Sequence, residues 1–98
     1  MENFNDLLKN DKVVLVEFFA SWCPHCQRMM PVVDDVRALL DGQAPVYQFD
    51  IDENNELAEA LGVQNIPTFI VYADGQEKWR SSGEMAGNDL YNKVLQYM

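Results

Sequence analysis

The sequence predicts an α/β fold with a central four-stranded mixed sheet flanked by helices on both faces. One observation is a continuous apolar run at 13–20, interrupted only by Glu17. Such a run is typical of a strand that is covered on both sides. A second observation is the dipeptide Asp74-Gly75, a strong signal for a two-residue turn between antiparallel strands. Together they predict parallel and antiparallel pairing in one sheet.

Helices and strands alternate along the first half of the chain. Residues 2–10 predict a short amphipathic helix, and the apolar run supplies the first strand. A long helix is expected to begin at 23–26 and to end at Asp41-Gly42, because glycine adopts the left-handed conformation that ends helices. Residues 45–51 predict the second strand, and a βαβ crossover makes it parallel to the first.

The second half of the chain predicts two further helices and an antiparallel hairpin. These elements are a helix at 56–61, strands at 68–72 and 76–81, and a closing helix that begins at Asn88. Asn54 or Asn55 is expected to cap the first of these helices and Asn88 the last, since Asn side chains accept hydrogen bonds from free N–H groups. The predicted order is α-β-α-β-α-β-β-α.

Length and composition limit the possible functions. The 98 residues, of which 48% are hydrophobic, predict one domain over 1–98. A net charge of −9 repels phosphate backbones, so nucleic-acid binding is not expected. Apolar runs are far shorter than the ~20 residues that cross a bilayer, so no membrane association is expected. The N-terminus has no leader pattern, which predicts a cytoplasmic protein, or a periplasmic or secreted one if a leader was removed.

The two cysteines stand three residues apart in Trp22-Cys23-Pro24-His25-Cys26, directly after the apolar strand. At the start of a helix, free N–H groups and the helix dipole stabilise the first thiolate. The pattern predicts that Cys23 is the attacking nucleophile and Cys26 the resolving thiol in disulfide exchange. Pro24 costs no hydrogen bond at a first helical position. His25, when protonated, would place a cation near Cys23 and tune the redox poise.

The cysteine pair admits three other interpretations. A structural zinc site needs about four ligands, whereas the chain offers two cysteines and one histidine, so no metal is predicted. An iron–sulfur cluster shared between two chains and a pair of inert, buried cysteines are further alternatives. The position of the motif favours reversible thiol chemistry over all three.

The segment from Phe18 to Cys26, followed by Ile66-Pro67-Thr68 and Gly83, resembles the thioredoxin family in the right order along nearly the whole chain. The resemblance implies the thioredoxin fold and the reduction, formation or isomerisation of protein disulfides. It implies that Cys23 and Cys26 form a redox-active disulfide and that no bound cofactor is needed. It also implies a flavin-containing thioredoxin reductase as electron donor; we expect a monomer.

The same resemblance assigns roles around the dithiol. Pro67 matches a proline that the family holds in cis, although a proline that merely starts a strand is the alternative. Trp22, Pro24, Ile66, Pro67 and Gly83 are expected to form the substrate-binding surface.

Glu17 stands where the family commonly has a buried aspartate. Burial should raise its pKa, and its carboxylate could take the proton of Cys26; the alternative is an inert acid. Gln48 occupies a position where many members have a lysine.

The expected function is a small thioredoxin-type reductase of protein disulfides with a more oxidising poise. The Pro-His dipeptide resembles that of periplasmic dithiol oxidases, so an oxidase or isomerase outside the cytosol is the alternative within enzymes. A non-catalytic protein-binding module with the same surface is the alternative outside them.

Overall fold

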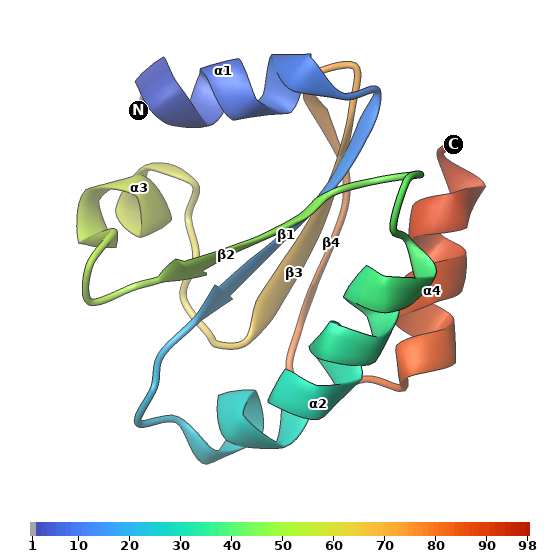
Figure 1. Ribbon diagram of the computed structural model, residues 1–98. Helices are drawn as coiled ribbons and strands as arrows, with labels where there is room; N and C mark the ends of the chain where they lie inside the picture. Colours follow the sequence, from blue (N-terminus) through green and yellow to red (C-terminus); the bar gives the residue numbers. More distant parts are fainter. Residues whose placement is uncertain (1) are drawn as a thin grey trace.

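Four strands of the computed structural model, which describes residues 2–98, form one sheet in the order β2-β1-β3-β4 (Figure 1). The elements in chain order are α1 (Glu2–Asn10), β1 (Val13–Phe19), α2 (Pro24–Leu39), β2 (Val46–Asp50), α3 (Asn55–Ala60), β3 (Thr68–Ala73), β4 (Gln76–Ser82) and α4 (Gly87–Gln96). This order confirms the predicted alternation of helices and strands.

Strand pairing follows from the connections. β1 pairs in parallel with β2 and antiparallel with β3, and β4 pairs antiparallel with β3. Glu17 on β1 stands opposite Gln48 on β2. At the hairpin between β3 and β4, Asp74 has φ +53° and Gly75 φ +77°, the left-handed conformations that a tight turn requires. The predicted mixed sheet is therefore confirmed.

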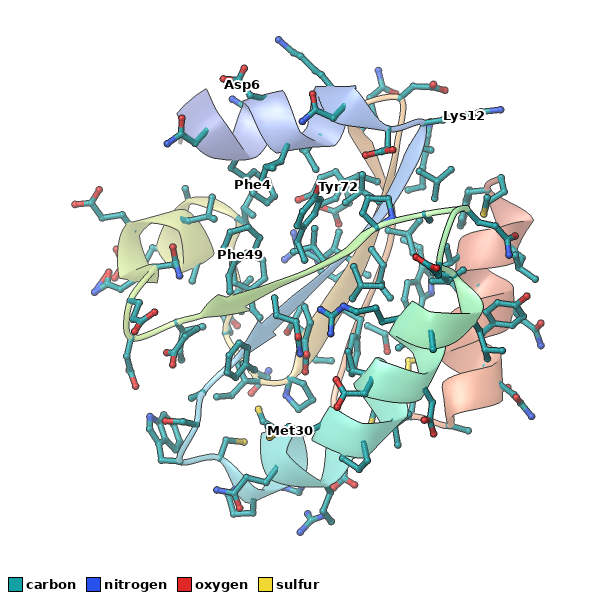
Figure 2. The ribbon with its side chains drawn as sticks, viewed as in Figure 1. Phe4, Asp6, Lys12, Met30, Phe49 and Tyr72 are labelled. Atoms are coloured by element: carbon teal, nitrogen blue, oxygen red, sulfur yellow. The ribbon has the colours of Figure 1, made fainter. Side chains whose placement is uncertain are left out.

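Helices cover both faces of the sheet. In Figure 1, α1 and α3 lie on one face and α2 and α4 on the other. Apolar residues of the strands alternate between two buried clusters, one beneath each pair of helices. Under α1, the ring of Phe4 meets Phe49 and Tyr72 edge to face at centroid distances of 5.5 and 5.7 Å (Figure 2). The alternating burial explains why β1 is apolar at nearly every position.

Two helix starts differ from the sequence prediction. α4 begins at Gly87 after Ala86, so Asn88 lies inside the first turn and does not cap the helix. A Cβ on Gly87 would lie 3.2 Å from Val32 Cγ1, so the first turn of α4 packs closely against α2. Asn54 precedes α3 as predicted, but its Nδ2 donates to the Asp50 carbonyl at 3.0 Å instead of capping the helix.

No helix within residues 2–98 has both the length and the apolar character that crossing a bilayer requires.

Candidate active site

The dithiol lies where β1 gives way to α2. Cys23 precedes the helix with extended backbone angles (φ −86°, ψ 119°), and Pro24 occupies the first helical position. The Cys23 N–H donates to the Ala20 carbonyl at 3.2 Å, which closes the short turn after the strand. Both cysteines are free thiols. The local sequence thus places Cys23 at the N-terminus of α2, where backbone N–H groups have no helical partner.

The pKa values of the two thiols are shifted in opposite directions. Burial alone would raise the pKa of Cys23, but hydrogen bonds from the Cys26 backbone and thiol and the His25 N–H, with the charge of Arg28, lower it. Burial raises the pKa of Cys26 to about 12, and the neighbouring Cys23 and Glu17 add to this rise. Cys26 is only 1% exposed. Cys23 is therefore the more acidic thiol of the pair and the one that ionises first.

A charged cluster that the sequence analysis missed lies next to the dithiol. Glu84 Oε2 accepts hydrogen bonds from Arg28 Nε at 3.0 Å and Nη2 at 2.8 Å. The same oxygen lies 2.7 Å from His25 Nδ1. These contacts, first those with Arg28, hold the pKa of Glu84 at about 2, so this carboxylate stays ionised at neutral pH.

The protonation of His25 follows from its two neighbours. Nδ1 faces the Glu84 carboxylate, which only accepts, and Arg28 Nη2 at 2.9 Å, which only donates. Nδ1 cannot hydrogen-bond to both in one protonation state. Since Arg28 already donates twice to Glu84, the arrangement favours an Nδ1–H that donates to Glu84. Arg28, which contributes its charge to the lower pKa of Cys23, is the cation beside the sulfur that the structure identifies.

The loop before β3 faces Cys23. The Ile66–Pro67 peptide bond is cis, as the family resemblance implied. The Ile66 carbonyl oxygen lies 3.9 Å from Cys23 Sγ, and Gly83 N–H donates to the Pro67 carbonyl at 2.8 Å. Gly83 has φ +96°, a conformation that favours glycine. Three residues expected at the substrate surface therefore meet beside Cys23.

Two hollows lie beside Ile66. One, of about 540 Å³, is lined by His25, Asn65, Ile66, Ser82, Gly83 and Glu84. The other, of about 340 Å³, includes Trp22 together with Ile66. Trp22 is 61% exposed, and its indole N–H donates to Asp52 at 2.9 Å. Pro24, between the cysteines in the sequence, is also exposed.

Glu17 is buried in the middle of β1, with 2% exposure. Its Oε1 accepts a hydrogen bond from Gln48 Nε2 at 2.8 Å. Burial raises the pKa of Glu17, while the Gln48 hydrogen bond and the charge of Arg37 lower it. The sequence predicted that the pKa of Glu17 is raised. It did not predict the opposing effect of the Arg37 charge, because Arg37 lies on another element.

Metal ligands are not gathered in the described part of the chain: residues 2–98 contain no cluster of three or more His, Cys, Asp or Glu side chains that could hold an ion.

Known proteins resemble the chain in sequence and in structure. A family model described as Thioredoxin matches residues 1–96. "Thioredoxin Y2, chloroplastic" from Arabidopsis thaliana is 37% identical over 94% of this chain, but the match covers only 56% of that relative. "Thioredoxin" from Rickettsia felis is 33% identical over 91% of this chain and 85% of its own length. The solved structure of a mutant thioredoxin from Halobacterium salinarum has a TM-score of 0.87 at 34% identity, covering 99% of this chain and 84% of that one.

The predicted thioredoxin fold is confirmed by this structural likeness, and the sequence match extends over nearly all of the chain. The chain belongs to the thioredoxin family, a family of protein-disulfide oxidoreductases with a redox-active Cys-x-x-Cys pair.

Proposed function

We propose that the chain is a thioredoxin-type reductase of protein disulfides that works through Cys23 and Cys26. The observation that supports this most directly is the opposite behaviour of the two thiols. The pKa of Cys23 is lowered, whereas that of Cys26 is raised to about 12. An attacking thiol must be ionised before it meets the substrate, while a resolving thiol should stay protonated until the mixed disulfide has formed.

The exchange proceeds in two steps. The Cys23 thiolate attacks one sulfur of a substrate disulfide; a Cys23–substrate bond forms, and the other substrate sulfur leaves as a thiolate that takes a proton from water. Cys26 then gives its proton to Glu17 and attacks the Cys23 sulfur. The Cys23–Cys26 disulfide forms, and the second substrate sulfur leaves. Two electrons have passed from the dithiol to the substrate.

The substrate segment is proposed to lie across Ile66, Pro67 and Gly83. The Ile66 carbonyl lies 3.9 Å from Cys23 Sγ, and Ile66 and Gly83 line one hollow beside it. Trp22 and Pro24 would contact the segment on the side of the helix start. No prosthetic group takes part, and a flavin-containing thioredoxin reductase would return the electrons.

The reduction potential of the Cys23–Cys26 pair is proposed to be more oxidising than that of a typical reductase. Arg28 stabilises the Cys23 thiolate, and any stabilisation of the reduced form makes the disulfide a stronger oxidant. The same observation favours the second candidate, a dithiol oxidase or isomerase outside the cytosol. A reducing role would place residues 1–98 as a monomeric domain in a reducing compartment such as the cytoplasm.

Insulin reduction with dithiothreitol as electron source tests the proposal. The wild-type protein should accelerate precipitation of the insulin B chain, Cys23→Ser should abolish the acceleration, and Cys26→Ser should accumulate a mixed disulfide on Cys23. Full activity of Cys23→Ser would refute the assigned nucleophile. Equilibration with glutathione then gives the reduction potential, and a value close to those of strong oxidants would favour the second candidate.

A further inference from the structure

A chain of side-chain hydrogen bonds leads from the surface to the buried carboxylate. Arg37 Nη2 on α2 donates to Gln48 Oε1 on β2 at 2.8 Å. Gln48 Nε2 in turn donates to Glu17 Oε1 on β1 at 2.8 Å. Three elements thus each supply one member, and their order is set by the parallel pairing of β1 with β2.

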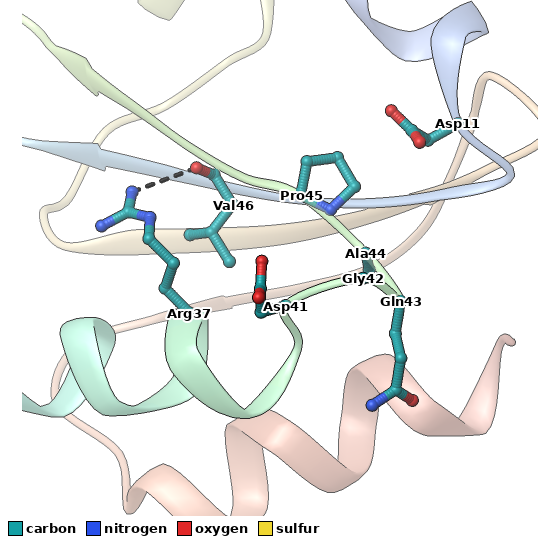
Figure 3. Close-up of a pocket in the computed structure, with 8 residues that line it drawn as sticks. All are labelled: Asp11, Arg37, Asp41, Gly42, Gln43, Ala44, Pro45 and Val46. Carbon is teal, nitrogen blue, oxygen red and sulfur yellow. Dashed lines mark hydrogen bonds between the residues drawn. The ribbon is translucent and has the colours of Figure 1, made fainter.

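Both ends of this hydrogen-bond chain are held in place. Arg37 offers only donors, so the Gln48 amide must turn its oxygen to the guanidinium and its NH₂ to the carboxyl group. Arg37 is held in addition by the Val46 carbonyl at 3.0 Å (Figure 3). Its guanidinium borders a hollow of about 420 Å³ that also includes Asp11 and Asp41. The positive end of this hydrogen-bond chain is therefore partly exposed, while its acidic end is buried.

The surroundings of Glu17 show how this hydrogen-bond chain affects the charge of the Glu17 carboxyl group. Burial favours the protonated acid, and Asp34, whose Oδ1 lies 3.5 Å from Arg37 Nη1, acts in the same direction. Gln48 and Arg37 act in the opposite direction and favour the carboxylate. The charge of Glu17 in turn raises the pKa of Cys26. Without Gln48 and Arg37, burial would raise the pKa of Glu17 further. The carboxyl group would then hold a proton more often and be less able to accept another.

We propose that Arg37 and Gln48 are positioning residues that keep Glu17 ready to accept the proton of Cys26. This inference rests on the proposed function. When Cys26 S–H loses its proton, the proton binds to Glu17, the Cys26 sulfur bonds to Cys23, and the substrate sulfur leaves with the electron pair of the broken bond. Gln48 occupies Oε1 of Glu17 as a donor, so Oε2 is the oxygen that takes the proton.

Reaction with a chromogenic aromatic disulfide separates the two steps. Attack by Cys23 releases the first coloured thiol, and resolution by Cys26 releases the second. In Gln48→Met and Arg37→Met, the second phase should be ~3- to 10-fold slower at about neutral pH, which is less than the full contribution of a general base. It should recover toward the wild-type rate at higher pH, while the first phase stays unchanged. Arg37→Lys, which keeps the charge, should retain most of the second-phase rate.

Carbon NMR titration of the Glu17 carboxyl group in the reduced protein gives a readout independent of activity. Its midpoint should move upward in Gln48→Met and Arg37→Met, and downward in the matched control Asp34→Asn. Unchanged midpoints and second phases in both methionine variants would overturn the proposal. Arg37 is 43% exposed, so its variants provide the test even if Gln48→Met does not fold. A wild-type first phase no faster than that of free cysteine would instead refute the proposed function.

Discussion

At the scale of single residues, Arg28 contributes a positive charge beside Cys23, and Glu84 holds Arg28. Burial opposes ionisation of Cys23, so hydrogen bonds and the Arg28 charge must outweigh it. The guanidinium side chain is 56% exposed, and such side chains are usually mobile. Two hydrogen bonds to Glu84 hold it in place. The electrostatics of the site therefore depend on a contact between α2 and the segment after β4.

Arg28→Met is expected to raise the pKa of Cys23, because it removes a cation that stabilises the thiolate. Alkylation of Cys23 at about neutral pH should slow by ~2- to 5-fold, the size expected for one partly exposed charge. Thiolate absorbance followed across pH gives the pKa directly. Arg80→Met is the matched control, because Arg80 pairs with Glu77 in the same way but on β4. An unchanged Cys23 titration in Arg28→Met would contradict the assignment.

His25→Ala tests the imidazole by the same titration, because alanine keeps the backbone N–H at this position. The sequence suggested that protonated His25 supplies the cation, whereas Cys23 receives the His25 backbone N–H and the Arg28 charge. We therefore expect Arg28→Met to shift the Cys23 titration more than His25→Ala does. The reverse order would return the tuning role to the imidazole.

Glu17→Gln should stabilise the protein in a pH-dependent way. Burial raises the pKa of Glu17 in the folded state, so the folded protein binds this proton more tightly than the unfolded chain. Wild-type stability from this group is present at low pH and is lost as pH rises through the folded-state pKa. The variant should gain about 1–2 kcal/mol near pH 8 and little near pH 4.

Urea unfolding at both pH values measures this gain, with the exposed Glu56→Gln as control. A gain that is equal at the two pH values would not come from the titration of Glu17. The resolving step should be slower in the same variant, because the amide cannot take the proton of Cys26.

At the scale of elements, the turn of the β3–β4 hairpin lies at the end of the sheet away from the dithiol. Phe18 pairs with Thr68 near the dithiol, whereas Val13 pairs with Ala73 at the turn end. Gly75→Ala should cost about 1 kcal/mol, because φ at this position is left-handed. Urea unfolding gives the cost, with the exposed Gln76→Ala as control. Cys23 alkylation should keep its wild-type rate; a slower rate would mean that strain at the turn reaches the site.

The elements themselves were predictable because each carries a local pattern. Apolar runs, a hairpin dipeptide and the glycine after α2 are written in neighbouring residues. The start of α4 was predicted wrongly, because packing of Gly87 against Val32 has no local signal.

Contacts between distant polar residues were also missed. Glu84 and Arg28 are 56 residues apart, and only the folded sheet brings the segment after β4 to α2. Arg37 reaches Gln48 in the same way, from a helix to the neighbouring strand. The sequence marked the cysteines, Glu17 and Pro67 because motifs identify them. It did not mark the residues that act on them, since a charged residue on a helix surface has no distinctive spacing.

At the scale of the whole molecule, the sheet divides the interior into two layers. Val14 belongs to the buried cluster under α1 and α3, and Val33 to the cluster under α2 and α4. The dithiol lies in a third, small cluster with Ala20, at the end of β1. The cysteines thus lie outside both layers.

This division predicts additive effects of mutations in the two layers. Val14→Ala and Val33→Ala should each cost about 2 kcal/mol, because each side chain is fully buried and loses two methyl groups. Since the sheet separates them, the double variant should cost their sum within ~0.5 kcal/mol. Val33→Ala with Val36→Ala is the matched pair within one layer, and neighbours on one helix face should depart from additivity. Urea unfolding of the three single and two double variants, with added sulfate if a double variant is too unstable, decides between the two outcomes. Strong coupling between Val14 and Val33 would show that the layers respond as one core, and distant core mutations should then also alter the reactivity of Cys23.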